Sequence, residues 1–146
     1  MRRRQFIKLA GSAAALSVMT LAAAGPVVAQ AEVQAKALRF AKGAKSAVVA
    51  NSIVRGEFDY YTIDANRNQH ASVRITSVES NAVFAIYEPG AKPAIRDGIL
   101  DVVGNALPGA DDVKSWSGKL PAAGAYLIVV GGTRGNATYR LSVGID

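Results

Sequence analysis

The stretch Ala125-Tyr126-Leu127-Ile128-Val129-Val130 is apolar at every position. A short continuous apolar run, preceded by a turn, is typical of a strand that is covered on both faces. The turn is marked by Pro121, which fixes its own φ, and by Gly124, which is free to take a left-handed conformation. We therefore expect this strand to lie at the centre of a β-sandwich. The residues expected to pack near it are Phe84, Ile86, Trp116 and Leu120.

Two further segments, residues 70–77 and 138–143, alternate apolar and polar side chains with a period of two. This is the pattern of strands that have one buried and one solvated face. The polar face of the first segment includes His70. The side chains expected to point inward are Ala71, Val73, Ile75, Tyr139, Leu141 and Val143.

Short runs of Val, Ile, Tyr and Thr alternate with Gly, Asn, Asp and Pro clusters along the rest of the chain. This spacing predicts an all-β fold, a small antiparallel β-sandwich of jelly-roll type with about eight strands. In the turn at 65–69, Asn68 tolerates positive φ. Between 89 and 112 the pattern fails, and the segment suits either a helical turn or an irregular strand. We expect strands at 37–41, 46–54, 58–64, 70–77, 82–88, 113–120, 124–131 and 137–144.

The first 31 residues have the features of an export signal. The sequence Arg3-Arg4-Gln5-Phe6-Ile7-Lys8 resembles the twin-arginine motif, in which Arg3 and Arg4 precede an apolar residue, Phe6, and a lysine, Lys8. These residues predict export by the twin-arginine route, to the periplasm or the medium.

An apolar, alanine-rich run over residues 9–21 follows the motif, and Ala29 and Ala31 form a small-x-small cleavage site. The competing interpretation is an uncleaved membrane anchor, because residues 9–28 approach the ~20 apolar residues that span a bilayer. We expect cleavage after Ala31, a flexible leader at 32–37 and a single domain at 38–146. The processed protein would then keep no stable membrane anchor.

The charge of the processed chain is close to balance. Four basic residues, Arg2, Arg3, Arg4 and Lys8, belong to the signal, whereas all 11 acidic residues follow it. Seventeen basic residues less these four leave 13, so the balance falls from +6 to +2. This is too small to indicate nucleic-acid binding, for which a strongly basic patch is expected.

The sequence contains no cysteine and one histidine, so it predicts no metal and no cofactor. Asp97, Asp101, Asp111 and Asp112 cluster in one irregular segment, but their spacing lacks the pattern of a calcium loop. We interpret them as turn formers. No Gly-x-Ser-x-Gly is present and His70 has no evident nucleophile beside it, so we predict no catalytic residues and no enzymatic activity.

Four segments resemble the periplasmic inhibitors of g-type lysozyme, and more widely the bacterial pre-peptidase C-terminal domains. They are residues 39–43, 58–69, 115–130 and 137–143. The resemblance implies a small antiparallel β-sandwich whose surface plugs the substrate cleft of a lysozyme. A strand tyrosine and arginines of the loop before the last strand carry that contact in the family.

The family tyrosine corresponds best to Tyr61, with Tyr60 as its neighbour, and the first loop arginine corresponds to Arg134. The loop at 131–136 is shorter than in the family and contains no second arginine. The resemblance therefore implies an exported, non-enzymatic inhibitor of g-type lysozyme that binds through Arg134 and Tyr61 or Tyr60. The alternative that it also implies is a stand-alone module that binds cell-wall glycan or has a structural role.

Overall fold

The computed structural model describes residues 33–97 and 99–146. The predicted export motif of Arg3, Arg4, Phe6 and Lys8 lies outside the described residues, as do the cleavage positions Ala29 and Ala31. Both therefore stay predictions from the sequence.

The described residues form strands and no helix, which confirms the prediction of an all-β fold. There are ten strands in this part of the chain, two more than expected. Their bounds are β1 Lys36–Ala37, β2 Ser46–Ile53, β3 Phe58–Ala65, β4 His70–Ser77, β5 Ala82–Tyr87, β6 Lys92–Arg96, β7 Ile99–Val103, β8 Ser115–Lys119, β9 Gly124–Gly132 and β10 Ala137–Ile145.

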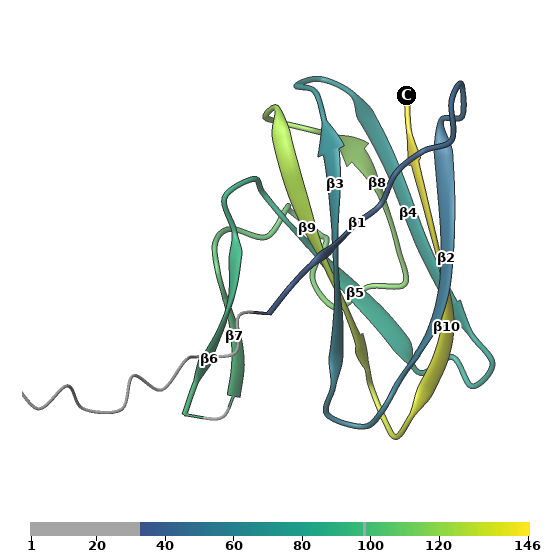
Figure 1. Cartoon of the computed structure of the whole chain (residues 1–146), viewed down its shortest axis with the longest axis vertical. Helices are drawn as coiled ribbons and strands as arrows, with labels where there is room; N and C mark the ends of the chain where they lie inside the picture. Colours follow the sequence, from purple (N-terminus) through teal and green to yellow (C-terminus); the bar gives the residue numbers. More distant parts are fainter. Residues whose placement is uncertain (1–32, 98) are drawn as a thin grey trace, which may run out of the picture. The chain divides into compact units, whose positions relative to one another are not determined.

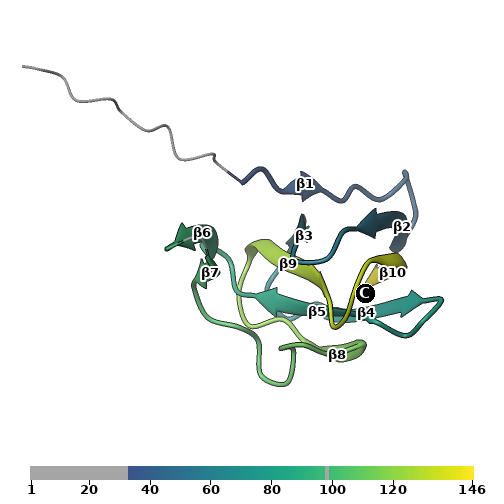
Figure 2. The same cartoon turned by 90° about the horizontal axis from the view of Figure 1, so that it is seen from below.

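Eight of these strands form two four-stranded sheets that pack face to face (Figures 1 and 2). One sheet has the order β1-β3-β9-β5 and the other has the order β2-β10-β4-β8. Neighbouring strands are antiparallel except β1 and β3, which are parallel and place Lys36 opposite Tyr61. The architecture is the predicted β-sandwich, with one parallel pair at its edge.

The core lies between the two sheets and is built by the period-two alternation. All six side chains expected to point inward from β4 and β10 are buried. The strand β9 lies between β3 and β5, and its inner residues Ile128 and Val130 are fully buried. Leu127 and Val129 point to the opposite face and are still only 3% and 8% exposed. The prediction of a strand covered on both faces is therefore confirmed, except that Ala125 is exposed.

A chain of hydrogen bonds fastens the two sheets together along one side. The hydroxyl of Tyr139 on β10 donates to Asp59 Oδ2 on β3 at 2.5 Å, so its oxygen accepts the hydroxyl hydrogen of Tyr61. Asn51 of β2 donates to the same carboxylate oxygen at 2.9 Å. Burial raises the pKa of Tyr139, and its hydrogen bonds to Asp59 and Tyr61 raise it further. Tyr139 therefore remains a neutral donor wherever the protein is folded near neutral pH.

The segment 89–112, which the sequence left open, contains an additional hairpin and no helix. Strands β6 and β7 pair only with each other (Figure 1). After the hairpin the chain returns to β5, where Leu107 and Ala110 are buried and exchange backbone hydrogen bonds with Ile86. The segment is therefore an irregular excursion that ends by covering one edge of the core.

The expected first strand at 37–41 is wrong. Only Lys36 and Ala37 form β1, and the chain then leaves the sheet after Leu38, which donates its amide to Thr62 O at 2.8 Å. Leu38 and Phe40 leave the strand pattern because their side chains pack against the core from the edge. The end of the expected leader is consequently part of the sheet.

Candidate functional site

Three turns, each of which connects one sheet to the other, gather at one end of the sandwich. They are residues 54–57 between β2 and β3, 78–81 between β4 and β5, and 133–136 between β9 and β10. They lie at the lower end in Figure 1. We call these three turns, together with Phe58 at the start of β3, the turn end.

A buried asparagine holds the turns in place. Asn81 is 2% exposed, and its side-chain amide donates to the carbonyl oxygens of Arg134 at 3.1 Å and Asn136 at 2.8 Å. The amide of Thr133 donates back to Asn81 O at 2.8 Å. Gly135 takes a φ of +59°, which closes the turn in a conformation that favours glycine. The loop that carries Arg134 is therefore rigidly attached to the neighbouring turn.

Arg134 projects from this loop and is exposed. Its guanidinium donates to the backbone carbonyl of Glu79 at 3.1 Å. This neutral acceptor orients the side chain but does not neutralise its positive charge. Lys45 and Asp146, at 3.3 Å, form the one ion pair among the residues that the structure describes. The guanidinium therefore remains available to pair with a carboxylate of a partner.

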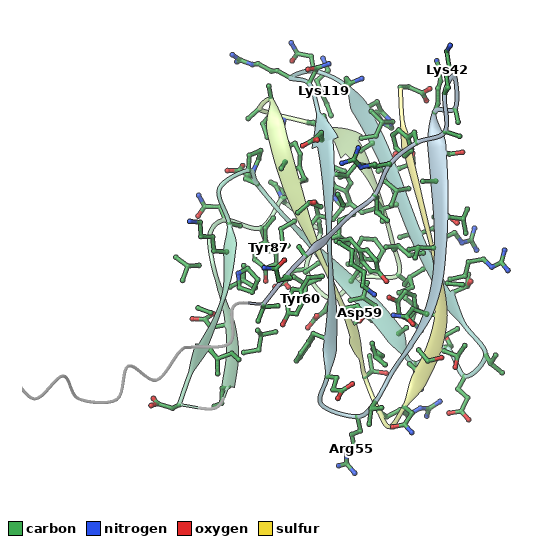
Figure 3. The ribbon with its side chains drawn as sticks, viewed as in Figure 1. Lys42, Arg55, Asp59, Tyr60, Tyr87 and Lys119 are labelled. Atoms are coloured by element: carbon green, nitrogen blue, oxygen red, sulfur yellow. The ribbon has the colours of Figure 1, made fainter. Side chains whose placement is uncertain are left out.

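A second arginine, Arg55, stands on the adjacent turn. Its backbone amide donates to Asn136 Oδ1 at 2.9 Å, which links the turn at 54–57 to the loop of Arg134. The side chain of Arg55 extends away from the body of the molecule at the lower end (Figure 3). The turn end thus has two cations on two linked turns, although the loop at 131–136 has only one arginine.

Exposed apolar side chains surround the arginines. Val78 is 95% exposed and Val54 is 56% exposed. Phe58 is 41% exposed, and its ring covers Gly131, where an added Cβ would lie only 2.9 Å from a ring carbon. Large apolar groups gathered at one exposed place are typical of a protein-binding surface. The ring of Phe58 could not lie against β9 in this way over a larger residue.

The structure separates the two tyrosines proposed for the contact. Tyr61 is 1% exposed and its hydroxyl is used in the core, so it cannot contact a partner. The preference for Tyr61 is therefore wrong for this chain, because β3 turns that side chain between the sheets. Tyr60 points to the outer face, two positions after Phe58 on the same face of β3. Partial burial there raises its pKa to about 12.

Tyr60 shares this outer face with Tyr87 of β5, since β9 between them pairs with both strands (Figure 3). Burial raises the pKa of Tyr87, and Asp111, Asp112 and Asp101 raise it further. Tyr60 therefore does not lie at the tip with Arg134. It lies behind Phe58, further from the turns.

The sequence did not indicate Arg55, Phe58, Val54 or Val78. They come from different connections between the sheets, and only the pairing of the strands brings these turns together. The one signal was the dipeptide Arg55-Gly56 between two strand patterns, because a glycine there marks a turn whose neighbours are displayed.

No group of three or more His, Cys, Asp or Glu side chains that could hold a metal ion occurs among the described residues. Asp97 and Asp112 have φ values of +52° and +49°, which agrees with their interpretation as turn formers. Asn68 likewise has a φ of +71°, as expected. Within the same residues, no helix is long and apolar enough to cross a membrane.

The fold and the turn end define a class of protein, a small two-sheet sandwich that presents arginine and apolar side chains on linked turns between the sheets. No protein-family model and no curated protein matches the chain. Solved structures do. The PliG of Aeromonas hydrophila, a periplasmic inhibitor of g-type lysozyme, is 31% identical and has a TM-score of 0.60, with 79% of this chain and 98% of that chain covered. The chain belongs to the PliG family.

One other inhibitor of g-type lysozyme supports this assignment, and a second has the same fold. A mutant PliG from Escherichia coli is 26% identical with a TM-score of 0.51, covering 77% of this chain and 100% of its own. The PliG of Salmonella Typhimurium has the same coverage, 24% identity and a TM-score of 0.53, and so shows the fold alone.

Proposed function

We propose that this chain is a periplasmic, non-enzymatic inhibitor of g-type lysozyme that blocks the substrate cleft with its turn end. The observation that carries the proposal is the match to the Aeromonas hydrophila PliG, which extends over 98% of that inhibitor. The twin-arginine signal of Arg3 and Arg4 supports export to the compartment in which those inhibitors are found.

The chemistry of the turn end suits such a cleft. Glycoside hydrolases use a pair of carboxyl groups that flank the scissile bond. A guanidinium pairs with a carboxylate through two parallel hydrogen bonds, which makes arginine the best side chain to compete for it. Arg134 would enter the cleft, and Phe58, Val54 and Val78 would pack against its rim.

Arg55 supplies the cation that the short loop lacks. Its turn is hydrogen-bonded to the loop of Arg134 through Asn136, so both guanidinium groups are displayed by one fastened unit. Because the turns are already ordered, little conformational entropy is lost on binding, and affinity benefits from this preorganisation. Tyr60 would contact the rim behind Phe58.

Replacing arginine by alanine at 134 tests this assignment. We expect Arg134→Ala to weaken inhibition of a g-type lysozyme by ~2 kcal/mol or more, a factor of about 30, as for a buried interface arginine. We expect Arg55→Ala to weaken it by ~1 kcal/mol or more. The measurement is the inhibition constant in a lysis assay.

The matched control is Arg67→Ala, which removes an exposed arginine. Arg67 lies in the turn that connects β3 to β4, at the opposite end of the sandwich. Its inhibition constant should equal that of the wild type. An unchanged constant for Arg134→Ala would show that the turn end is not the inhibitory surface.

A further inference from the structure

The outer face of the sheet β2-β10-β4-β8 carries positive charge without any negative charge. None of its four strands contains Asp or Glu, although 11 acidic residues occur in the chain. Three cations, Arg74, Arg140 and Lys119, occupy outward and exposed positions, as does His70. We call the outward positions of these four strands the hydroxyl face, because most of the others are serine or threonine.

Two of the cations are neighbours. Arg74 on β4 pairs with Ser142, and Arg140 on β10 pairs with Thr76, so the two arginines are diagonal neighbours on the same face. Diagonal positions of adjacent strands are about 7–8 Å apart, within reach of long side chains, and two like charges at this separation repel each other. Neither arginine forms an ion pair with a described residue. An anionic ligand would relieve this repulsion.

The hydroxyl groups between the cations are held in rows. Ser52 and Thr138 share a hydrogen bond of 2.8 Å, and Ser72 and Ser117 share one of 3.3 Å. A hollow of about 460 Å³ opens on this face beside Arg74. Five serines line it, together with Val73, Val143 and Trp116, whose ring packs against the core; the serines are Ser46, Ser72, Ser115, Ser117 and Ser142.

We infer that the hydroxyl face binds an acidic glycan, a sugar polymer that carries carboxylate groups. Hydroxyl rows can exchange hydrogen bonds with sugar hydroxyls, and the guanidinium groups can bind carboxylates in a bidentate way. Among acidic glycans we commit to peptidoglycan, and this choice rests on the proposed export to the periplasm. No aromatic side chain stands outward from these four strands for a base to stack on, which disfavours single-stranded nucleic acid.

The hydroxyl face is the outer surface of one sheet, whereas the turn end is formed by the turns that connect the two sheets. Binding to peptidoglycan would therefore leave Arg134 free, and the inhibitor could be held on the polymer that a lysozyme attacks. Strands β2 and β10 also lie on the side away from the β6–β7 hairpin in both views (Figures 1 and 2), so that hairpin does not cover them.

The test is co-sedimentation of the chain, purified after export, with three probes in the absence of any lysozyme. The probes are purified peptidoglycan sacculi, the same sacculi with their carboxyl groups amidated, and double-stranded DNA as a competitor. The variant is Arg74→Gln with Arg140→Gln. The matched control is Arg39→Gln with Arg67→Gln, which removes the same charge from exposed arginines that lie off this face.

We expect binding to untreated sacculi that is released by salt, since screening weakens exposed charge pairs. The affinity of the Arg74 and Arg140 double variant for sacculi should fall by a factor of about ten or more. The control double variant should bind as the wild type does. Both double variants should unfold cooperatively at about the same temperature as the wild type, which shows that they are folded.

Four results would overturn the inference. The first is that the chain does not sediment with sacculi at low ionic strength, and the second is that it binds amidated sacculi equally well. The third is that both double variants lose the same amount of binding. The fourth is that the double-stranded DNA displaces the chain from sacculi. Because no lysozyme is present, a failure of the inhibitory function leaves this result readable.

Discussion

Tyr139 is the residue whose single hydroxyl connects the two sheets of this sandwich. It donates to the carboxylate of Asp59 and accepts from Tyr61, so one oxygen atom joins β10 to β3, and Asn51 of β2 donates to the same carboxylate. A hydrogen bond to a charged group contributes about 1.5–3 kcal/mol to stability, more than a neutral one. The side chain therefore combines the packing of a core aromatic with a specific polar link.

We expect Tyr139→Phe to lower the free energy of unfolding by about 2 kcal/mol, because it leaves Asp59 short of a donor and Tyr61 short of an acceptor. Denaturant unfolding followed by fluorescence measures this. The control is Tyr60→Phe, whose hydroxyl makes no hydrogen bond to another described residue, and which should change stability at neutral pH by less than ~0.5 kcal/mol. Equal stabilities of Tyr139→Phe and the wild type would contradict this role for the link.

The raised pKa of Tyr60 predicts that the protein loses stability at high pH. Its pKa is raised from 10.0 to about 12 by burial in the folded state. The unfolded chain therefore releases this proton first, so the stabilising effect is complete below pH 10 and is lost as the pH rises towards 12.

We expect Tyr60→Phe to flatten the fall in unfolding free energy between about pH 9 and about pH 11.5 relative to the wild type. Urea unfolding at the two pH values measures the fall, and an ultraviolet titration would show one late-ionising tyrosine fewer. Parallel pH dependences of the two proteins would mean that Tyr60 is not shielded from water.

Neighbouring residues of a strand point to opposite faces, so Tyr60 and Tyr61 must be on different faces, but the sequence does not say which one is buried. A period of two is compatible with either tyrosine facing the core, and the neighbouring residues Asp59 and Thr62 do not distinguish the two arrangements. Asp59 is half-buried, and Tyr139 and Asn51 both donate hydrogen bonds to it. Tyr139 is more than 70 residues away from Asp59 in the sequence. Such a long-range link leaves no local signal.

At the scale of elements, the β6–β7 hairpin is the part that the sequence could not assign. Pro93 and two glycines, Gly98 and Gly104, interrupt its apolar residues, so neither period is visible. Its side chains Ile95 and Ile99 are exposed, and none of the described side chains of the two strands belongs to the buried core. Without a core to face, the hairpin has no regular alternation to display.

The hairpin should be removable. Its ends meet closely, since a Cβ added to Gly104 would lie 2.8 Å from the Cα of Ala91. We expect replacement of residues 92–103 by Asn-Gly, a two-residue hairpin turn, to change the unfolding free energy by less than ~1 kcal/mol. Thermal unfolding tests this, and a loss of cooperative unfolding would show that the hairpin supports the sandwich.

The strands of the two sheets other than β1 were predictable, most clearly where a strand has an apolar period or a continuous apolar run. For β4 and β9, the expected segments 70–77 and 124–131 lie within one residue of the observed bounds. The turns between them were also readable, as Asn68 and Gly124 show. What sequence reasoning missed is the gathering of three turns, because the sheet order, which brings them to one end, is not written in any single segment.

At the scale of the whole molecule, charge and function are arranged on different surfaces. The turn end shows two arginines with apolar neighbours, whereas the sheet β2-β10-β4-β8 shows cations among hydroxyl groups. The chain expected after cleavage at Ala31 has a balance of only +2, so neither surface is apparent from the overall charge. Local distribution decides what each surface can bind.

The central claim is that the chain inhibits g-type lysozyme, and a lysis assay tests it most directly. The exported chain is added to a g-type lysozyme acting on bacterial cells, with a c-type lysozyme as the control enzyme. We predict that the g-type enzyme is inhibited and the c-type enzyme is not. Lysis by the g-type enzyme that continues unchanged at a micromolar excess of this chain would contradict the claim.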